Sequence, residues 1–153
     1  MRRMLAAIGV IALLVTVGAV GSATARSGHA ATSKAKLQVR KGKLGRFIVD
    51  AKGLTLYLFQ KDHNGKSACY GKCAKVWAPY LTSGKPTAAS GVSSSKVGVT
   101  KRKGGATQAT YGGHPLYHYD DDKKPGQTEG EGSKEFGAEW YVVGTNGKKI
   151  DKS

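Results

Sequence analysis

A short motif occurs twice in this chain of 153 residues, with its copies 60 residues apart. The first copy reads Gly53-Leu-Thr-Leu-Tyr-Leu-Phe-Gln-Lys-Asp62, and the second reads Gly113-His-Pro-Leu-Tyr-His-Tyr-Asp-Asp-Asp122. A tryptophan follows each copy. Repetition at a fixed offset is typical of a duplicated supersecondary unit, so the sequence predicts two related halves. The repeated residues are Gly53, Leu56, Tyr57, Phe59, Asp62 and Trp77 in the first half, and Gly113, Leu116, Tyr117, Tyr119, Asp122 and Trp140 in the second.

The predicted halves are rich in β-forming residues. Residues 47–50 and 54–59 are β-rich runs separated by turn residues, and residues 107–111 and 115–119 repeat this plan. Further strands are expected at 96–102, 139–144 and 148–150, and a short helix across 68–76. We therefore expect an all-β fold, an antiparallel sheet or small sandwich built from two repeats, with at most a short helix near the cysteines.

The chain divides by composition into three parts. Residues 1–25 have the features of a signal peptide, namely Arg2 and Arg3, an apolar run and an Ala-x-Ala site that predicts cleavage after Ala25. An uncleaved anchor is the alternative, because the apolar run is long for a signal. Residues 26–44 are small, polar and basic, which predicts a flexible leader. Residues 45–151 are then one β domain, with repeats at 45–104 and 105–151.

The charge of the expected mature chain is strongly positive and unevenly spread. Removal of residues 1–25 leaves 23 basic and ten acidic residues, a net charge of +13. Residues 26–119 contain only two acidic residues, whereas residues 120–139 contain seven. A cationic protein binds polyanions with an affinity that falls as salt rises. Because the protein is expected to be exported, the expected partners are anionic polymers or surfaces of the cell envelope.

Cys69 and Cys73 are the only cysteines. An even number of cysteines in an oxidising compartment predicts an intramolecular disulfide. The C-x-x-x-C spacing closes a very small ring, so the backbone between the two residues has to turn or coil. The bond would therefore serve mainly to hold the local shape.

The repeated aromatic and acidic residues have a structural explanation. Alternate side chains of a strand share a face, so Leu56 points away from the face that Tyr57 and Phe59 share. Asp62 and Asp122 follow their strands, where a carboxylate can accept backbone N–H bonds and close a turn. The two tryptophans have the size and apolarity of core anchors. We therefore predict that the motif is a scaffold before it is a site.

These residues resemble a family of bacterial secreted repeat proteins and predicted lipoproteins that carry a repeated Tyr-x-aromatic-x-x-Asp motif. The resemblance extends over about residues 45–147, and it includes residues 67–77, 111–117, 125–127, 130–132 and 140–141 in addition to the first motif. It implies no activity, since the function of that family is unknown. Similar members often have a lipid-anchored cysteine after the signal, but this chain has no cysteine before Cys69. We therefore expect no lipid anchor.

Three kinds of chemical site remain as alternatives. Cysteine and histidine side chains are suited to copper or zinc, which would make the protein an envelope redox or metal-handling protein; the residues are Cys69, Cys73, His63, His114 and His118. The loop of residues 62–67 or the carboxylates of residues 120–131 could bind calcium, although no EF-hand pattern is present. Asp62 and Asp122 could flank a glycosidic bond.

The sequence contains no assembled catalytic motif and no recognised nucleic-acid-binding module. The prediction is therefore a non-catalytic exported protein that associates with the cell envelope through its basic surface. We expect no catalytic residues, cofactor, metal, specific nucleic acid or membrane span after cleavage. The sequence specifies no oligomeric state.

Overall fold

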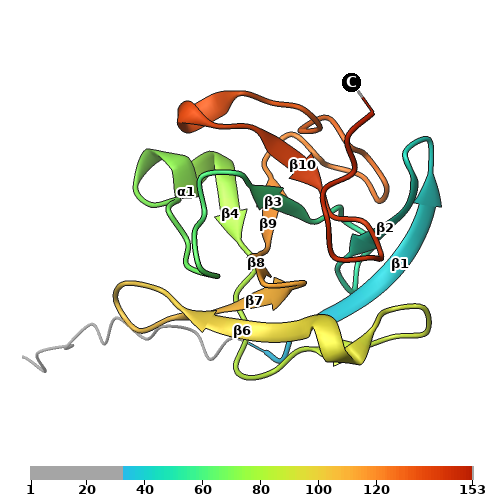
Figure 1. Cartoon of the computed structure of the whole chain (residues 1–153), viewed down its shortest axis with the longest axis horizontal. Helices are drawn as coiled ribbons and strands as arrows, with labels where there is room; N and C mark the ends of the chain where they lie inside the picture. Colours follow the sequence, from blue (N-terminus) through green and yellow to red (C-terminus); the bar gives the residue numbers. More distant parts are fainter. Residues whose placement is uncertain (1–32, 153) are drawn as a thin grey trace, which may run out of the picture.

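The computed structural model describes residues 33–152 of the chain and consists mainly of β-strands (Figure 1). The strands of the first half are β1 (Lys36–Gly42), β2 (Gly45–Val49), β3 (Tyr57–Phe59) and β4 (Trp77–Pro79), followed by β5 (Thr87–Ala88). Those of the second half are β6 (Val97–Lys101), β7 (Thr107–Tyr111), β8 (His114–Pro115), β9 (Tyr117–Tyr119) and β10 (Trp140–Val142). Within residues 33–152 the only α-helix is α1 (Lys72–Val76), which has five residues, and 3-10 turns lie at Ser94–Lys96 and Glu135–Gly137. The predicted all-β fold is confirmed.

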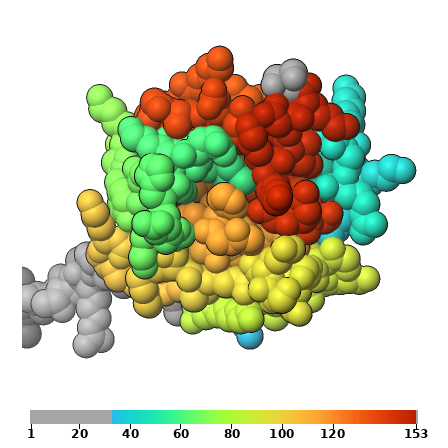
Figure 2. All heavy atoms as spheres, viewed as in Figure 1, coloured from blue at the N-terminus to red at the C-terminus, as the bar shows by residue number. Residues whose placement is uncertain are grey.

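Three sheets make up the domain. The central sheet has the strand order β10-β3-β9-β4, and the outer sheets have the orders β2-β1-β5 and β6-β7-β8. All strand pairs are antiparallel except the short pair of β1 with β5. Figure 2 shows the two halves as one packed body, with a central orange segment of the second half enclosed by green and red segments.

The central sheet has an internal two-fold relationship. Tyr57 of β3 pairs with Tyr117 of β9, so the two equivalent tyrosines lie opposite each other. On one side of this pair Trp140 lies opposite Phe59, and on the other side Trp77 lies opposite Tyr119. The first half thus adds β4 to β9 of the second half, and the second half adds β10 to β3 of the first half. The sheet is complete only when both halves are present.

Both faces of the central sheet are buried at β3 and β10, because an apolar cluster covers each face there, whereas Ala78 of β4 is exposed. Leu56, Leu58 and Leu116 belong to one cluster together with residues of β2, β7 and β10. Tyr57 and Phe59 belong to the other cluster, which contains the tryptophans and the cysteines. This division confirms the alternation predicted for residues 56–59. The residues of β3 are buried on both faces, which explains the continuous apolar run of residues 56–59 in the first motif.

The glycines of the two motifs lie in the turns that precede the repeated strands. In the first turn Asp50 Oδ1 accepts hydrogen bonds from the N–H groups of Lys52 and Leu54, and Gly53 has a φ of 82°. In the second turn Gly112 and Gly113 have φ values of 59° and 85°. Backbones at such φ values favour glycine, since it has no Cβ to clash with the preceding carbonyl group.

Several predicted boundaries differ from those of the structure. Residues 36–42, which we expected in a flexible leader, form β1 because Leu37 is buried in the core and the strand pairs with β2. The predicted continuous strands 54–59 and 115–119 are each interrupted at a leucine, where the chain leaves its own hairpin and enters the central sheet. The region expected as a strand at 148–150 makes only an isolated bridge through Lys149.

The expected division of the repeats at residues 104 and 105 falls inside the turn between β6 and β7, which pair with each other. The signal peptide, its cleavage site and residues 26–32 of the leader lie outside the described residues. Within residues 33–152 no helix has the length and hydrophobicity needed to cross a membrane.

Candidate functional site

The tyrosines and aspartates of the two motifs are joined crosswise. The hydroxyl group of Tyr57 donates a hydrogen bond of 2.5 Å to Oδ2 of Asp122. The hydroxyl group of Tyr117 donates a hydrogen bond of 2.8 Å to Oδ2 of Asp62. Each motif therefore supplies the donor for one pair and the acceptor for the other. The sequence indicates the residues, but the crossing of the partners follows from the two-fold arrangement of β3 and β9.

The second oxygen of each aspartate closes the loop that follows its own strand. Asp62 Oδ1 accepts a hydrogen bond of 2.7 Å from the N–H group of Ala68, and Asp122 Oδ1 accepts one of 3.0 Å from the N–H group of Glu129. These bonds agree with the turn-closing role that the sequence predicts for both carboxylates. Since each carboxylate binds both a backbone N–H group and a buried tyrosine, the arrangement is that of a structural cross-link.

Burial determines the protonation of these pairs. Burial raises the pKa of Asp62 to about 6, even though the Ala68 N–H group and the Tyr117 hydroxyl favour its charged form. Burial also raises the pKa of Asp122, against the hydrogen bond from Tyr57. The pKa of each tyrosine is raised by burial and by its neighbouring aspartate. The tyrosines therefore remain protonated donors at neutral pH.

The two pairs differ in their surroundings. Asp122 is buried, whereas Asp62 is only half-buried. The Tyr117 hydroxyl also lies 2.8 Å from Oγ of Ser67, which belongs to the loop that Asp62 closes. The Tyr57 hydroxyl instead accepts a 3.4 Å contact from the N–H group of Gly130. The pair at Asp62 thus lies closer to solvent and is part of a larger polar network.

Four aromatic rings from both halves form a continuous stack beside the crossed pairs. Phe59 stacks on Trp140 with ring centroids 3.9 Å apart, and Trp140 stacks on Trp77, also at 3.9 Å. Tyr119 continues the stack on the other side of Trp77 at 4.3 Å. The tryptophans are completely buried. We predicted one anchor for each half, and the structure places the two anchors against each other.

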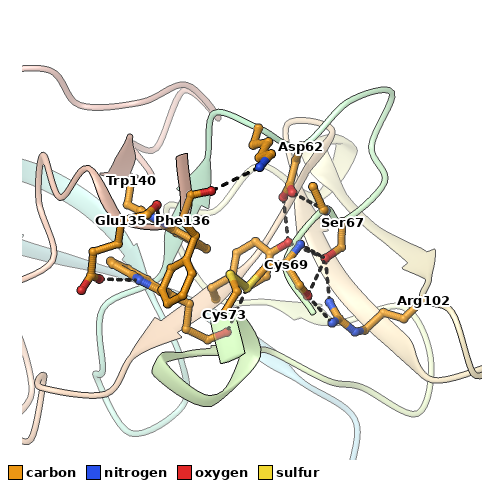
Figure 3. Close-up of a disulfide and its surroundings, with 12 residues drawn as sticks. Asp62, Ser67, Cys69, Cys73, Arg102, Glu135, Phe136 and Trp140 are labelled. Atoms are coloured by element: carbon orange, nitrogen blue, oxygen red, sulfur yellow. Dashed lines mark hydrogen bonds between the residues drawn. A yellow bond between two sulfur atoms is a disulfide. The ribbon is translucent and has the colours of Figure 1, made fainter. Parts of the chain in front are cut away.

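The predicted disulfide between Cys69 and Cys73 is present and closes the loop that leads into α1 (Figure 3). Its Cα atoms are 5.3 Å apart, and both residues are buried in the cluster that contains the tryptophans. The bond therefore holds the start of α1 against the core.

Arg102 holds the same loop from the neighbouring hairpin, and we did not identify it from the sequence. Its guanidinium group donates to the carbonyl oxygen of Cys69 at 2.6 Å, to Ser67 Oγ at 2.8 Å and to Gln108 Oε1 at 2.6 Å. It also lies 4.4 Å from the ring centroid of Tyr70. Arg102 is the only arginine after residue 46, where every other basic residue is a lysine. An arginine is the better residue for several simultaneous hydrogen bonds, so this exception was the signal in the sequence for a special role of Arg102.

The residues considered for a metal or redox site are not brought together. Both cysteine sulfurs are in the disulfide, so neither is a thiolate ligand. His118 Nε2 lies 3.1 Å from Asp50 Oδ2, His63 lies in a turn, and His114 is on β8. Among residues 33–152 no group of three or more His, Cys, Asp or Glu side chains could hold a metal ion, which also removes support for the calcium alternative.

The acidic segment 120–139 uses several of its carboxyl groups inside the domain. Glu135 Oε2 accepts a hydrogen bond of 2.9 Å from Nε1 of Trp77, and the Glu135 carbonyl oxygen accepts one of 3.1 Å from Nε1 of Trp140. Glu131 Oε2 accepts one of 2.7 Å from the N–H group of Val142. The carboxylates of Glu135 and Glu131 thus hold Trp77 and β10 in place, whereas Asp120, Asp121 and Glu129 of the same segment are exposed.

The basic hairpin, which we define as residues 34–46, contains β1 and the start of β2, and all of its charged side chains are basic. It lies at one edge of the molecule and is coloured blue to cyan in Figure 1. Its six basic residues are all exposed: Lys34, Lys36, Arg40, Lys41, Lys43 and Arg46. No acidic residue occurs between residues 33 and 49. Among the described residues, none of these six cations takes part in an ion pair.

The fold and its centre define a class of protein, a two-repeat β domain whose repeats are locked by crossed Tyr–Asp pairs and a shared aromatic stack. The family comparison gives the same organisation. The chain belongs to a family described as a secreted repeat of unknown function, which matches it twice, at residues 38–80 and 98–144. These ranges together include more than half of the chain. No curated protein and no solved structure matches it significantly.

Proposed function

We propose that this member of the secreted repeat family is a non-catalytic protein of the cell envelope, retained there because its basic hairpin binds anionic envelope polymers. The family description supports an exported protein. The crossed Tyr–Asp pairs support a scaffold and not a reaction centre, because every carboxylate oxygen in them accepts a hydrogen bond from the protein.

The observation that carries the proposal is the set of six exposed, unneutralised cations on the basic hairpin. The six cations lie within residues 34–46, with no acidic residue between them in the sequence, and all six are exposed. They give the surface of the hairpin a local excess of positive charge. Such a surface attracts repeating negative charges, and its affinity comes largely from the release of counterions.

The rest of the described domain is also basic, and this raises the affinity of the whole molecule for polyanions. Of the 25 lysines and arginines, 22 lie in residues 33–152, together with all ten acidic residues. Binding through net charge alone would therefore depend little on which lysine is removed. Binding through the basic hairpin would depend on the hairpin lysines specifically.

Two quadruple variants separate these cases. The hairpin variant is K34Q/K36Q/K41Q/K43Q, and the matched control is K72Q/K75Q/K85Q/K103Q, whose four lysines are also exposed. Both lose four positive charges. Binding is measured by co-sedimentation with purified bacterial cell wall and by titration with inorganic polyphosphate, each from low to high salt.

We expect the hairpin variant to bind at least about tenfold more weakly than the control at low salt, with a smaller salt dependence. Equal weakening of the two variants would show that net charge and not the hairpin is responsible. Absence of salt-sensitive binding by the unmodified protein would overturn the proposal altogether.

A further inference from the structure

A groove lies beside the end of the basic hairpin. Its volume is about 290 Å³. One wall is the end of β1 and the turn after it, which contribute Arg40, Lys41, Gly42 and Lys43. The other wall is residues 125–129 of the second half. The groove therefore forms only when the two halves are folded together, and three of its lining side chains are cationic.

Arg40 is held in this groove by the close approach of two glycines. A Cβ atom on Gly126 would lie 2.3 Å from Arg40 Nε, and one on Gly53 would lie 3.5 Å from an Arg40 terminal nitrogen. The N–H group of Gly126 donates to the carbonyl oxygen of Gly53 at 3.0 Å, which fixes the two glycines relative to each other. The Arg40 side chain therefore lies close to the backbone at both glycines.

The repeat itself does not require an arginine at this position. Arg40 on β1 lies opposite Phe47 on β2, and the corresponding position in the other outer sheet is Thr100, which lies opposite Gln108. Ile48 and Ala109, which follow Phe47 and Gln108 in the chain, establish that the two positions correspond. Their N–H groups donate to carbonyl oxygens at equivalent places in the two halves. Because Thr100 serves the same place in the other half, the strand pairing by itself does not require an arginine there.

The chemistry of the groove suits an oxyanion. A guanidinium group presents parallel N–H donors that match the two oxygens of a phosphate or carboxylate group. Arg40 has no carboxylate partner within ion-pair distance among the described residues, so these donors are open to a ligand. Lys41 and Lys43 line the same groove and add positive charge. Glu129 is the one acidic residue in the lining, and it opposes an anion there.

We infer that Arg40 is the residue that recognises the polymer, by binding one phosphate or carboxylate group of it in the groove between β1 and residues 125–129. This inference rests on the proposed function. The hairpin lysines supply non-specific attraction, and Arg40 supplies the geometric selection of the anionic group.

The variant R40K tests the inference, because it keeps the charge and removes the bidentate donor geometry. R46K is the matched control, since Arg46 is an exposed arginine of the same hairpin that does not line the groove. Affinity is measured in separate titrations with inorganic polyphosphate and with poly(L-glutamate), and neutral dextran serves as the blank. A thermal melt of each variant establishes that it is folded.

We expect R40K to weaken binding about tenfold for at least one polymer, and R46K to change it less than about twofold. The polymer that responds identifies the group as phosphate or carboxylate. We also expect E129Q to strengthen binding of that polymer, whereas E139Q, a control outside the groove, does not.

Equal effects of R40K and R46K, or an unchanged affinity in E129Q, would overturn the inference. If R40K binds like the unmodified protein while the hairpin lysine variant is weakened, only the inference fails and the proposed function stands. If neither R40K nor the lysine variant is weakened, both fail.

Discussion

The hydroxyl group of Tyr57 donates its hydrogen bond to Asp122, which belongs to the other repeat, and the aspartate of its own motif accepts a hydrogen bond from Tyr117. The two motifs are therefore exchanged and do not form two independent units. Together with the exchanged strands β4 and β10, this arrangement makes the folding of each half depend on the other.

Energetic coupling should follow the crossed partners. Asp62→Ala and Asp122→Ala are each expected to lower the melting temperature clearly and to cost on the order of 2–4 kcal/mol of folding free energy. In a double-mutant cycle, Tyr57→Phe and Asp122→Ala should be coupled by about 1–3 kcal/mol, because the first variant removes only the hydroxyl that Asp122 accepts. Chemical denaturation of the four proteins in the cycle measures this energy.

The matched control is the cycle of Tyr57→Phe with Asp62→Ala, two residues of the same motif that do not bond to each other. We expect its coupling energy to be within about 0.5 kcal/mol of zero. If the control cycle has the larger coupling energy, the crossed arrangement is incorrect. If an aspartate variant melts like the unmodified protein but loses polymer binding, that carboxylate has a functional role.

Asp62 should make the protein less stable as the pH rises from about 4 to about 7. Its pKa is about 6 in the folded protein and near 3.8 in the unfolded chain, so the folded state holds the proton more tightly in this range. A raised folded pKa contributes stability that is present at low pH and is lost as the pH passes 6. Allowing for the partial exposure of Asp62, we expect a contribution of about 1–2 kcal/mol.

The measurement is the free energy of unfolding of the unmodified protein and of Asp62→Asn at pH 4.5 and 7.5. The asparagine cannot titrate, so the difference between the two proteins isolates the contribution of Asp62 from those of Asp122 and Glu131, whose pKa values burial also raises. A pH dependence that is identical in the two proteins would contradict the prediction.

Stacked Trp77 and Trp140 should give an optical signature. Two indole rings with centroids 3.9 Å apart and an interplanar angle of 6° lie close enough for their excited states to interact, so we expect distinct circular dichroism bands. Trp77→Phe and Trp140→Phe should each abolish these bands while leaving a folded protein that is destabilised by about 1–3 kcal/mol. Persistence of the bands in either variant would show that they do not arise from this pair.

Reduction of the Cys69–Cys73 disulfide should lower stability only moderately. The closed loop is very short, so the entropic contribution of the bond is about 2 kcal/mol. Mass spectrometry of the non-reduced protein should show a mass two hydrogens below that of the dithiol. Melts of Cys69→Ser/Cys73→Ser with and without reductant provide the control, because this variant should not respond to reductant. A reductant effect in it would show that the change arises elsewhere.

The local features of the fold could be predicted because they depend on neighbouring residues. The alternation of Leu56 and Leu58 with Tyr57 and Phe59 indicated a strand with two distinct faces, and both faces are buried as separate clusters. The turn at Gly53 and the loop closed by Asp62 follow from short-range hydrogen bonds of known types. The disulfide followed from its compartment and from the number of cysteines.

The leader and the continuous strands were predicted incorrectly because their outcome depends on distant partners. β1 looks like a polar tail in the sequence, since only Leu37 among its residues is completely buried, yet pairing with β2 along its length makes it a strand. The interruption at Leu56 arises because residues on its two sides pair with different strands, one of them from the other repeat. Local patterns contain no information about such exchanges.

The sequence by itself determined that the chain holds two copies of one β unit, which side chains of each copy share a face, and that the cysteines pair. The first two depend on spacing along the chain, and the third depends on the even number of cysteines and on the compartment. Only the tertiary structure decided that Tyr57 pairs with Asp122, that the tryptophans stack on each other, and that Arg102 and Arg40 have defined places. Most of these contacts join residues more than 30 positions apart; the exceptions are the contact of Arg40 with Gly53 and the bond of Arg102 to Gln108. The long-range contacts exist only because two similar strands pair antiparallel at their equivalent tyrosines.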